Sequence, residues 1–370
     1  SGIAAGAGIM AAQYWGKQDA ASIEKVIPIA LRTNLLFSGL FTILAGFCPE
    51  MLMRIFTNDA ALVASGSQYL RAVALSYVLC GISQVYLILL KNTGHAAVSS
   101  RISSTAVVLN IILNAILIYG LCGAPALGIR GAAYATVAAR VVELIWAYLE
   151  TKKPERVRIL WNRLFSSAGK ILSEDFWRYT LPVLAASLVW GIAYVLYSVI
   201  MGHMGSDAVA ANSITSIAKS LLSCLIRGVS GGAGVLIGNL LGANELEKAR
   251  EYGRRLSHLS IAIGIVTGGL LMLISPAIVH FAPLSDTAAE YLQYMLLFCG
   301  LNLMAQSVNT TVLDGIFCAG GDAKFDMQGN IGAMWCFSVP LGFLAAFWLK
   351  LPVMVAVSYT HLRAHETSLH

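Results

Sequence analysis

Charged residues are scarce in this sequence. Asp, Glu, Lys and Arg make up 12% of its 370 residues, whereas 57% are hydrophobic. Soluble domains carry about 25% charged residues, so this chain lacks the surface that a water-soluble fold needs. Its apolar residues recur in runs along the whole sequence, which argues against one large soluble core. Because runs of about 20 apolar residues can cross a bilayer as helices, the sequence predicts an all-α, polytopic membrane protein.

Patterns typical of metal sites, nucleotide sites and catalytic centres are also missing. The seven cysteines stand singly, with no CxxC pair or Cys/His cluster, which argues against a zinc site or a disulfide framework. No Walker lysine motif supports ATP-driven transport. The basic residues behind the net charge of +6 stand between the apolar runs, so nucleic acid is not an expected partner. No cofactor is expected.

Nine complete apolar spans are predicted. They cover residues 23–48, 66–91, 98–120, 128–150, 177–203, 207–241, 255–280, 288–317 and 326–349. Residues 1–15 look like the end of another span. Lys and Arg gather in alternate connections, above all in the polar stretch 151–175, which predicts that this set of connections is cytoplasmic. The expected location is a bacterial plasma membrane, crossed several times by the chain.

The two halves of the sequence repeat each other. The stretch Gly8-Ile-Met-Ala-Ala-Gln-Tyr-Trp-Gly16 aligns without gaps with Gly234-Val-Leu-Ile-Gly-Asn-Leu-Leu-Gly242, at an offset of 226 residues. Both stretches place small residues at four-residue spacing, which lets helix backbones pack closely in lipid. The expected packing positions are Gly8, Gly16, Gly234, Gly238 and Gly242. The repeat predicts two pseudo-symmetric bundles of about six helices each; in transporters with parallel repeats the substrate cavity lies between the halves.

The bundles are expected to be incomplete. We assign residues 1–150 to the N-terminal bundle, 151–175 to a cytoplasmic linker and 176–356 to the C-terminal bundle. The chain begins without Met inside a glycine-rich apolar helix, which indicates that an earlier span is absent. Residues 357–370 resemble an in-frame translation of a transposase-type sequencing adapter. They are treated as a non-native tail and excluded from functional inference.

Short motifs give the sequence a family resemblance. Gly8-Ile-Met-Ala-Ala-Gln-Tyr-Trp-Gly-Lys-Gln-Asp19 resembles the end of the second span in multidrug and toxic compound extrusion (MATE) transporters. Six further matches follow in the family's order: Phe56-Thr-Asn-Asp59, Leu109-Asn-Ile-Ile-Leu-Asn114, Gly128-Ile-Arg-Gly-Ala-Ala-Tyr-Ala-Thr136, Ile237-Gly-Asn-Leu-Leu-Gly-Ala243, Ala319-Gly-Gly-Asp322 and Val339-Pro-Leu-Gly342. One departure is Cys318, where family members commonly have Arg.

The resemblance implies a twelve-helix transporter that lacks its first and last spans in this sequence. It further implies export of chemically diverse, often cationic small molecules, driven by inward movement of Na⁺ or H⁺. The expected surroundings are the lipid bilayer, and the expected state is a monomer. A flippase of lipid-linked oligosaccharide or lipid, with a similar two-bundle layout, is the alternative. A membrane-embedded enzyme is less favoured, since it needs convergent catalytic groups.

Asp314 is the leading candidate for cation coupling, including as a Na⁺ ligand. An ionisable residue inside an apolar span is costly and marks function by default. At 100° per residue, Asn302, Gln306 and Asn309 fall within about 60° of one another on a helix. Asp314 falls about 80° from Gln306, so all four can edge one polar cavity. Their counterparts at an offset of 227 residues are the apolar Leu75, Leu79, Ile82 and Leu87. Pairing of Asp314 with a basic residue or a helix end is the alternative.

Aromatic, amide and basic residues of neighbouring spans are candidates for the substrate wall. They are Tyr194, Tyr197, Asn212 and Lys219. Flat aromatic faces suit cationic organic molecules through cation–π attraction. Lys219 either pairs with an acidic group or lines the cavity, and Arg227 is expected to be structural.

Two further expectations concern the spans themselves. Arg140 and Glu143 stand three residues apart, which predicts an ion pair on one helix. Pro182 is expected at the start of a helix, where proline is common.

Overall fold

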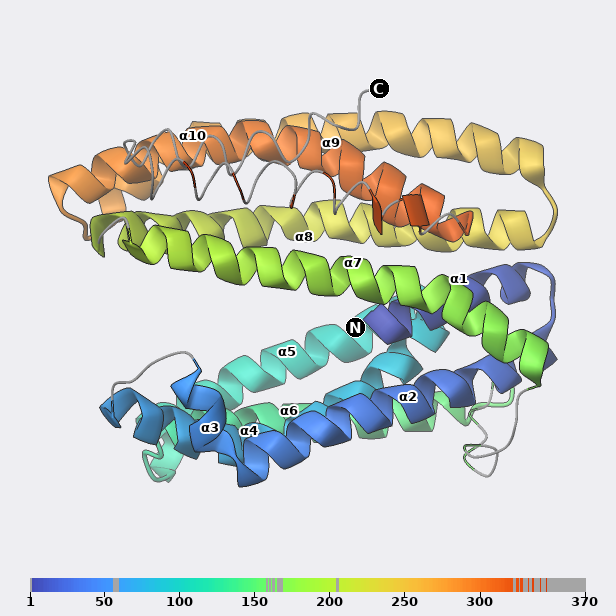
Figure 1. Ribbon diagram of the computed structural model, residues 1–370, viewed down its shortest axis with the longest axis horizontal. Coiled ribbons are helices and arrows are strands. Elements are labelled where there is room, and N and C mark those ends of the chain that lie inside the picture. The colour runs from blue at the N-terminus through green and yellow to red at the C-terminus, as the bar shows by residue number, and fades with distance from the viewer. Residues whose placement is uncertain are drawn as a thin grey trace. The chain divides into compact units, whose positions relative to one another are not determined.

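The computed structural model describes residues 2–55, 60–157, 159, 161, 164, 169–203, 206–321, 324–325, 327–328, 332, 335, 340 and 344. Every regular element among these residues is a helix (Figure 1). The chain forms two compact units, Ser1–Thr180 and Leu181–His370. The Phe56–Asp59 motif, most of the span predicted at 326–349 and the tail at 357–370 lie outside the described residues.

The first unit is built on four long helices. Its elements are α1 (Gly2–Gly16), α2 (Ala20–Phe47), α3 (Pro49–Arg54), α4 (Ala60–Leu90), the π-helix η1 (Lys91–His95), α5 (Ala96–Tyr119), the 3₁₀-helix η2 (Leu121–Gly123) and α6 (Ile129–Thr151). α4 packs against α2 and α6, and α5 packs against α6. The ring of Tyr86 is buried in this core, and its hydroxyl accepts a 2.8 Å hydrogen bond from the indole of Trp161. That bond ties the polar stretch after α6 to α4.

The second unit is a bundle of very long helices. Its elements are α7 (Lys170–His203), which begins in the first unit, α8 (Ser206–Gly242), α9 (Leu246–Phe281), α10 (Asp286–Asn309) and the π-helix η4 (Thr310–Phe317). α8, α9 and α10 run alongside one another (Figure 1) and pack together. The apolar residues buried between them include Ile226, Leu271 and Leu303.

Six helical segments in the described part of the chain are long and apolar enough to cross a membrane. They are Ala20–Phe47, Ala60–Tyr119, Ile129–Thr151, Asp207–Gly242, Leu246–Phe281 and Asp286–Phe317. The prediction of an all-α, polytopic membrane protein is confirmed. The segment Ala60–Tyr119 contains two predicted spans, because α4 and α5 join through η1, where Thr93 and Gly94 leave the helical conformation.

α7 begins earlier than hydropathy indicates. It starts at Lys170 rather than near residue 177, and Pro182 therefore lies inside the helix. The expectation that Pro182 opens a helix is wrong. Hydropathy marks only the apolar part of a helix, and the polar first turns of α7, where Lys170 and Glu174 approach within 3.9 Å, continue it into the connection.

The turns that follow the two aligned stretches have the same backbone geometry. Gln18 and Asn244, 226 residues apart, both adopt left-handed conformations, with φ of 58° and 61°. The amide of Asp19 donates to the carbonyl of Tyr14 at 2.9 Å, and the amide of Glu245 donates to that of Leu240 at 3.0 Å. Homologous sequence thus produces the same helix end twice.

Glycines allow close helix approach at several of the repeated positions. A Cβ added to Gly8 would lie 2.8 Å from a side-chain carbon of Ile88, and one added to Gly234 would lie 3.4 Å from the carbonyl oxygen of Gly315. Gly238 and Gly242 are buried, and Gly16 is half-buried.

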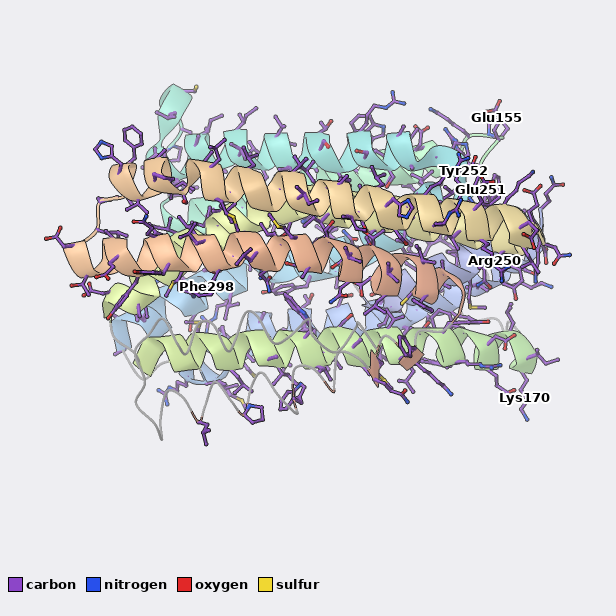
Figure 2. All side chains as sticks on the ribbon, turned by 90° about the horizontal axis from the view of Figure 1, so that it is seen from above. Glu155, Lys170, Arg250, Glu251, Tyr252 and Phe298 are labelled. Carbon is purple, nitrogen blue, oxygen red and sulfur yellow. The ribbon has the colours of Figure 1, made fainter. Side chains whose placement is uncertain are left out.

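Charged side chains of the second unit gather at helix ends. Arg250, Glu251 and Tyr252 lie near the start of α9, whereas Phe298 of α10 lies far along the bundle from them (Figure 2). This separation is the one that a membrane imposes, since charges favour the aqueous boundaries and apolar residues favour the hydrocarbon layer.

Candidate functional site

A polar cluster lies where α8 packs against α10. Lys219 of α8 donates a 3.3 Å hydrogen bond from Nζ to Oδ1 of Asn302 on α10, whose side chain is only 3% exposed. Ser223 follows Lys219 by one helical turn, and Gln306 follows Asn302 by one turn, so each pair shares a helix face. Lys219, Ser223, Asn302 and Gln306 are called the Lys219 cluster below.

Two members of the Lys219 cluster have unsatisfied polar atoms. Ser223 Oγ and Gln306 Oε1 are buried, and neither has a hydrogen-bond partner among the described residues. Buried polar atoms are nearly always hydrogen-bonded in proteins. Two buried polar atoms without hydrogen-bond partners inside an apolar bundle are typical of a site that binds water or a ligand.

Asp314 lies on the π-helix η4, not on a continuous α-helix. Ser230 of α8 donates a 2.8 Å hydrogen bond to the carbonyl oxygen of Thr310, the first residue of η4. A π-helix turns through fewer degrees per residue than an α-helix, so Asp314 is closer in angle to Gln306 than the α-helical projection gives. π-helical turns occur frequently at functional sites.

The four polar residues predicted to edge one cavity differ in their exposure to solvent. Asn302 is buried, Gln306 and Asn309 are half-buried, and Asp314 is exposed. Asp314 also lies within the last turn of the apolar segment Asp286–Phe317 rather than at its centre.

The remaining candidates for the substrate wall lie on α7 and α8. Asn212 is half-buried on α8 and stands seven residues, about two turns, before Lys219 on the same helix face. Tyr194 and Tyr197 lie on α7, and their side chains lie outside the described part of the structure.

Sequence reasoning found only part of a second polar site, in the first unit. The predicted ion pair is present: Arg140 donates to Oε2 of Glu143 at 2.6 Å. Ser83 of α4 donates to the other carboxylate oxygen at 2.7 Å, and Glu143 is only 2% exposed. The carboxylate therefore joins α4 to α6. Glu143, an acidic residue in the middle of the apolar run 128–150, was its signal in the sequence.

An amide ladder crosses from α5 to α6 in the same unit. Asn114 donates to Oδ1 of Asn110 at 3.1 Å, and Asn110 donates to the hydroxyl of Thr136 at 3.4 Å. The i, i+4 spacing of the two asparagines in an apolar run could have revealed the ladder.

Among the described residues, no group of three or more His, Cys, Asp and Glu side chains forms a metal site. Na⁺ prefers oxygen donors, which carbonyls, amides and a single carboxylate also supply. The assignment of a Na⁺ ligand to Asp314 stays a prediction.

Comparison with known proteins identifies the family. The MatE family model matches residues 1–116 and 182–344. A probable multidrug resistance protein NorM of Thermotoga maritima is 24% identical over 335 residues, which cover 88% of this chain and 71% of that protein. The uncharacterized transporter YisQ of Bacillus subtilis is 21% identical over 342 residues, covering 92% of this chain and 75% of YisQ.

Solved structures show the same fold. A MOP superfamily transporter from Pyrococcus furiosus superimposes with a TM-score of 0.86 at 20% identity, covering 98% of this chain and 81% of that one. An outward-facing multidrug resistance MATE family transporter gives a TM-score of 0.85 at 18% identity, with coverages of 98% and 81%. The fold is thus that of a multi-pass membrane transporter. The chain belongs to the MatE family, as its motifs indicated.

Proposed function

We propose that this protein is a secondary active transporter that exports diverse, often cationic organic compounds in exchange for Na⁺ or H⁺. It works by alternating access, as a monomer in the plasma membrane. Multidrug resistance is named for the Thermotoga maritima relative, and the family membership of the chain supports the same class of substrate. The connection at 151–175 faces the cytoplasm in this proposal, between an N-terminal bundle at 1–150 and a C-terminal bundle at 176–356.

The observation that carries this proposal is the Lys219 cluster. Its polar atoms lie among apolar helices that pack like a membrane bundle, and two of them lack partners among the described residues. A protein that only needed stable packing would place apolar side chains there. We assign Lys219, Asn302, Gln306, Asn309 and Asn212 to the substrate cavity, together with Tyr194 and Tyr197.

Coupling requires that the ion and the substrate favour different states of the transporter. A ligand shifts an equilibrium only through its differential affinity for the two states. We assign the coupling cation to Asp314, whose carboxylate either takes up H⁺ or binds Na⁺. Its exposure on the π-helix η4 supports this role, because π-helical turns occur frequently at functional sites.

Dye efflux tests the proposed function. Cells that express the full-length gene are loaded with a fluorescent cationic dye, and the Na⁺ and pH gradients are collapsed separately with ionophores. Collapse of the coupling gradient should stop efflux, and collapse of the other should leave it unchanged. Efflux that persists without either gradient would contradict an antiport mechanism.

A further inference from the structure

Lys219 lies among described helices that offer its ammonium group no carboxylate. The packed helices α8, α9 and α10 have no Asp or Glu within residues 208–244, 252–285 or 291–313. In the described part of the chain, the ammonium of Lys219 makes one hydrogen bond, to the neutral amide of Asn302, and no ion pair.

The carboxylate of Asp314 is too far along the bundle to neutralise this charge. It follows Asn302 by twelve residues, and an α-helix rises about 18 Å over that length. Arg227 follows Lys219 by eight residues on the same helix, about 12 Å along its axis, and adds a second basic side chain. Among the described residues, positive charge is therefore in excess around the Lys219 cluster.

The other members of the cluster supply neutral hydrogen-bonding groups. The hydroxyl of Ser223 can donate or accept, and the amides of Asn302 and Gln306 each carry two donors and an acceptor. Since an amide can turn end over end with little change in shape, Gln306 can direct its NH₂ group toward a ligand. An ammonium, a hydroxyl and two amides together match the hydrogen-bonding needs of an anionic oxygen group.

A bound anion also offsets the free-energy cost of burying the Lys219 ammonium without a counter-ion. A buried ammonium without a counter-ion is unfavourable, and burial beside an anion compensates for lost hydration. A cationic group at the same place would meet repulsion from both Lys219 and Arg227. The same anion can accept hydrogen bonds from the hydroxyl of Ser223 and, once its amide is turned, from the NH₂ group of Gln306.

We propose that the Lys219 cluster binds an anionic oxygen group of the transported compound, most simply a carboxylate. The inference rests on the proposed function and narrows it: among otherwise similar organic cations, the protein prefers zwitterions with a carboxylate. A lipid phosphate has the same chemistry, so the experiment includes an arm for it.

Two dyes with one ring system test the preference. Rhodamine B carries a xanthene cation and a free carboxylate, and its methyl ester carries the cation alone. Binding of each dye to the purified full-length protein in a neutral detergent is measured by fluorescence anisotropy, without any ion gradient. We expect wild-type protein to bind rhodamine B at least about tenfold more tightly than the ester, because hydrogen bonds to charged groups are worth more than a factor of ten.

Three variants assign the preference to the cluster. Lys219→Gln removes the charge and should remove the preference, so that rhodamine B and its ester bind with similar affinity. Asn302→Asp keeps the lysine but gives it an internal carboxylate partner, so rhodamine B binding should fall although the protein stays as stable as wild type. Lys248→Gln is the control: it makes the same change at the exposed start of α9 and should retain the preference.

The outcomes distinguish failure of the anion site from failure of the proposed transport function. Tight ester binding without a preference for rhodamine B overturns the anion site and leaves the transporter assignment standing. A preference that persists in Lys219→Gln or in Asn302→Asp likewise overturns it. Competition by phosphatidylglycerol, together with equal binding of both dyes, would assign the site to lipid and overturn the substrate carboxylate. Binding of neither dye contradicts the proposed function itself.

Discussion

The hydroxyl of Ser230 donates a 2.8 Å hydrogen bond to the carbonyl oxygen of Thr310, the residue at which α10 gives way to the π-helix η4. A π-helical turn leaves part of the regular α-helical hydrogen bonding unmade. Ser230 thus stabilises the change of helix type from the neighbouring helix α8. Because Asp314 lies on η4, this contact also fixes the orientation of the proposed coupling carboxylate.

Ser230→Ala should therefore affect transport as well as stability. Loss of an interhelical hydrogen bond in a membrane bundle costs about 1 kcal/mol, which lowers the thermal unfolding midpoint in detergent by a few degrees. Ser213→Ala is the control, since its hydroxyl donates only to Val209 within α8 and is exposed. Equal unfolding midpoints for the two variants would show that the Ser230 contact does not stabilise η4.

Two adjacent glycines of α9 allow a matched comparison of Gly→Ala variants, one at a helix contact and one in open space. A Cβ added to Gly268 would lie 2.3 Å from the carbonyl oxygen of Gly300 on α10, whereas one added to Gly269 would meet nothing within 4 Å. Gly268→Ala should destabilise the protein by about 1–3 kcal/mol, as overpacking does in cores. Gly269→Ala should be neutral or slightly stabilising, since Ala favours helix. Thermal unfolding of both variants checks this order; a reversed order would mean that α9 and α10 do not pack at these residues.

Hydropathy and repetition predicted most of the fold. The run at 207–241 became α8, and the repeated stretches that end at Gly16 and Gly242 are followed by turns of the same geometry. The π-helices η1 and η4 could not be predicted in this way. η1 has the polar sequence Lys-Asn-Thr-Gly-His, which hydropathy reads as a connection between two spans, and η4 is a largely apolar continuation of α10. The change of helix type at η4 depends on tertiary partners such as Ser230. The start of α7 was missed because its polar first turns do not register as a span.

Glu143 should be among the most sensitive acidic residues in the first unit. It is buried and accepts hydrogen bonds from Arg140 and Ser83, so Glu143→Ala leaves both donors without their acceptor. Breaking a buried pair costs about 3 kcal/mol, and the partial exposure of Arg140 reduces this somewhat. Glu143→Gln should cost less, since an amide oxygen still accepts. Glu251→Ala removes an exposed i, i+4 pair with Arg255 and should cost under about 0.5 kcal/mol.

Chemical denaturation in detergent distinguishes these three variants. Similar losses of unfolding free energy for Glu143→Ala and Glu251→Ala would show that the Glu143 cluster contributes no more than a surface pair.

The turn before α2 should respond to acid. Asp19 caps α2: its carboxylate accepts bonds from the hydroxyl and the backbone amide of Ser22, and these bonds lower its pKa below the ordinary value of 3.8. A lowered pKa in the folded state contributes stability above the ordinary pKa, and this contribution is lost as the pH falls through the folded-state value. Asp19→Asn still caps the helix but cannot titrate.

Unfolding midpoints of wild type and Asp19→Asn should therefore converge between about pH 4 and pH 2. Ser22→Ala, which removes one donor, should weaken this pH dependence. A constant difference between wild type and Asp19→Asn across that range would show that the cap bonds do not depend on ionisation.

The candidate site was less predictable than the fold. A polar set on one helix could be identified from spacing, because Asn302 and Gln306 are one turn apart. Its connection to Lys219, 83 residues earlier, depends on the packing of α8 against α10, and no local pattern encodes that contact. The same applies to Ser83 and Glu143, which are 60 residues apart. Local sequence gives the residue types on a face, and only tertiary packing decides which faces meet.

Asp314→Asn tests the proposed coupling residue directly. The variant keeps the shape of the side chain but can neither take up a proton nor balance a cation, so gradient-driven export in proteoliposomes should be lost. Binding of rhodamine dyes should remain within about twofold of wild type, because Asn302, the residue that contacts Lys219, lies about 18 Å away along the helix. Asp286→Asn makes the same change at the exposed first turn of α10 and should transport normally. Normal gradient-dependent export by Asp314→Asn would move the coupling site elsewhere, and loss of dye binding together with export would place Asp314 in the substrate site instead.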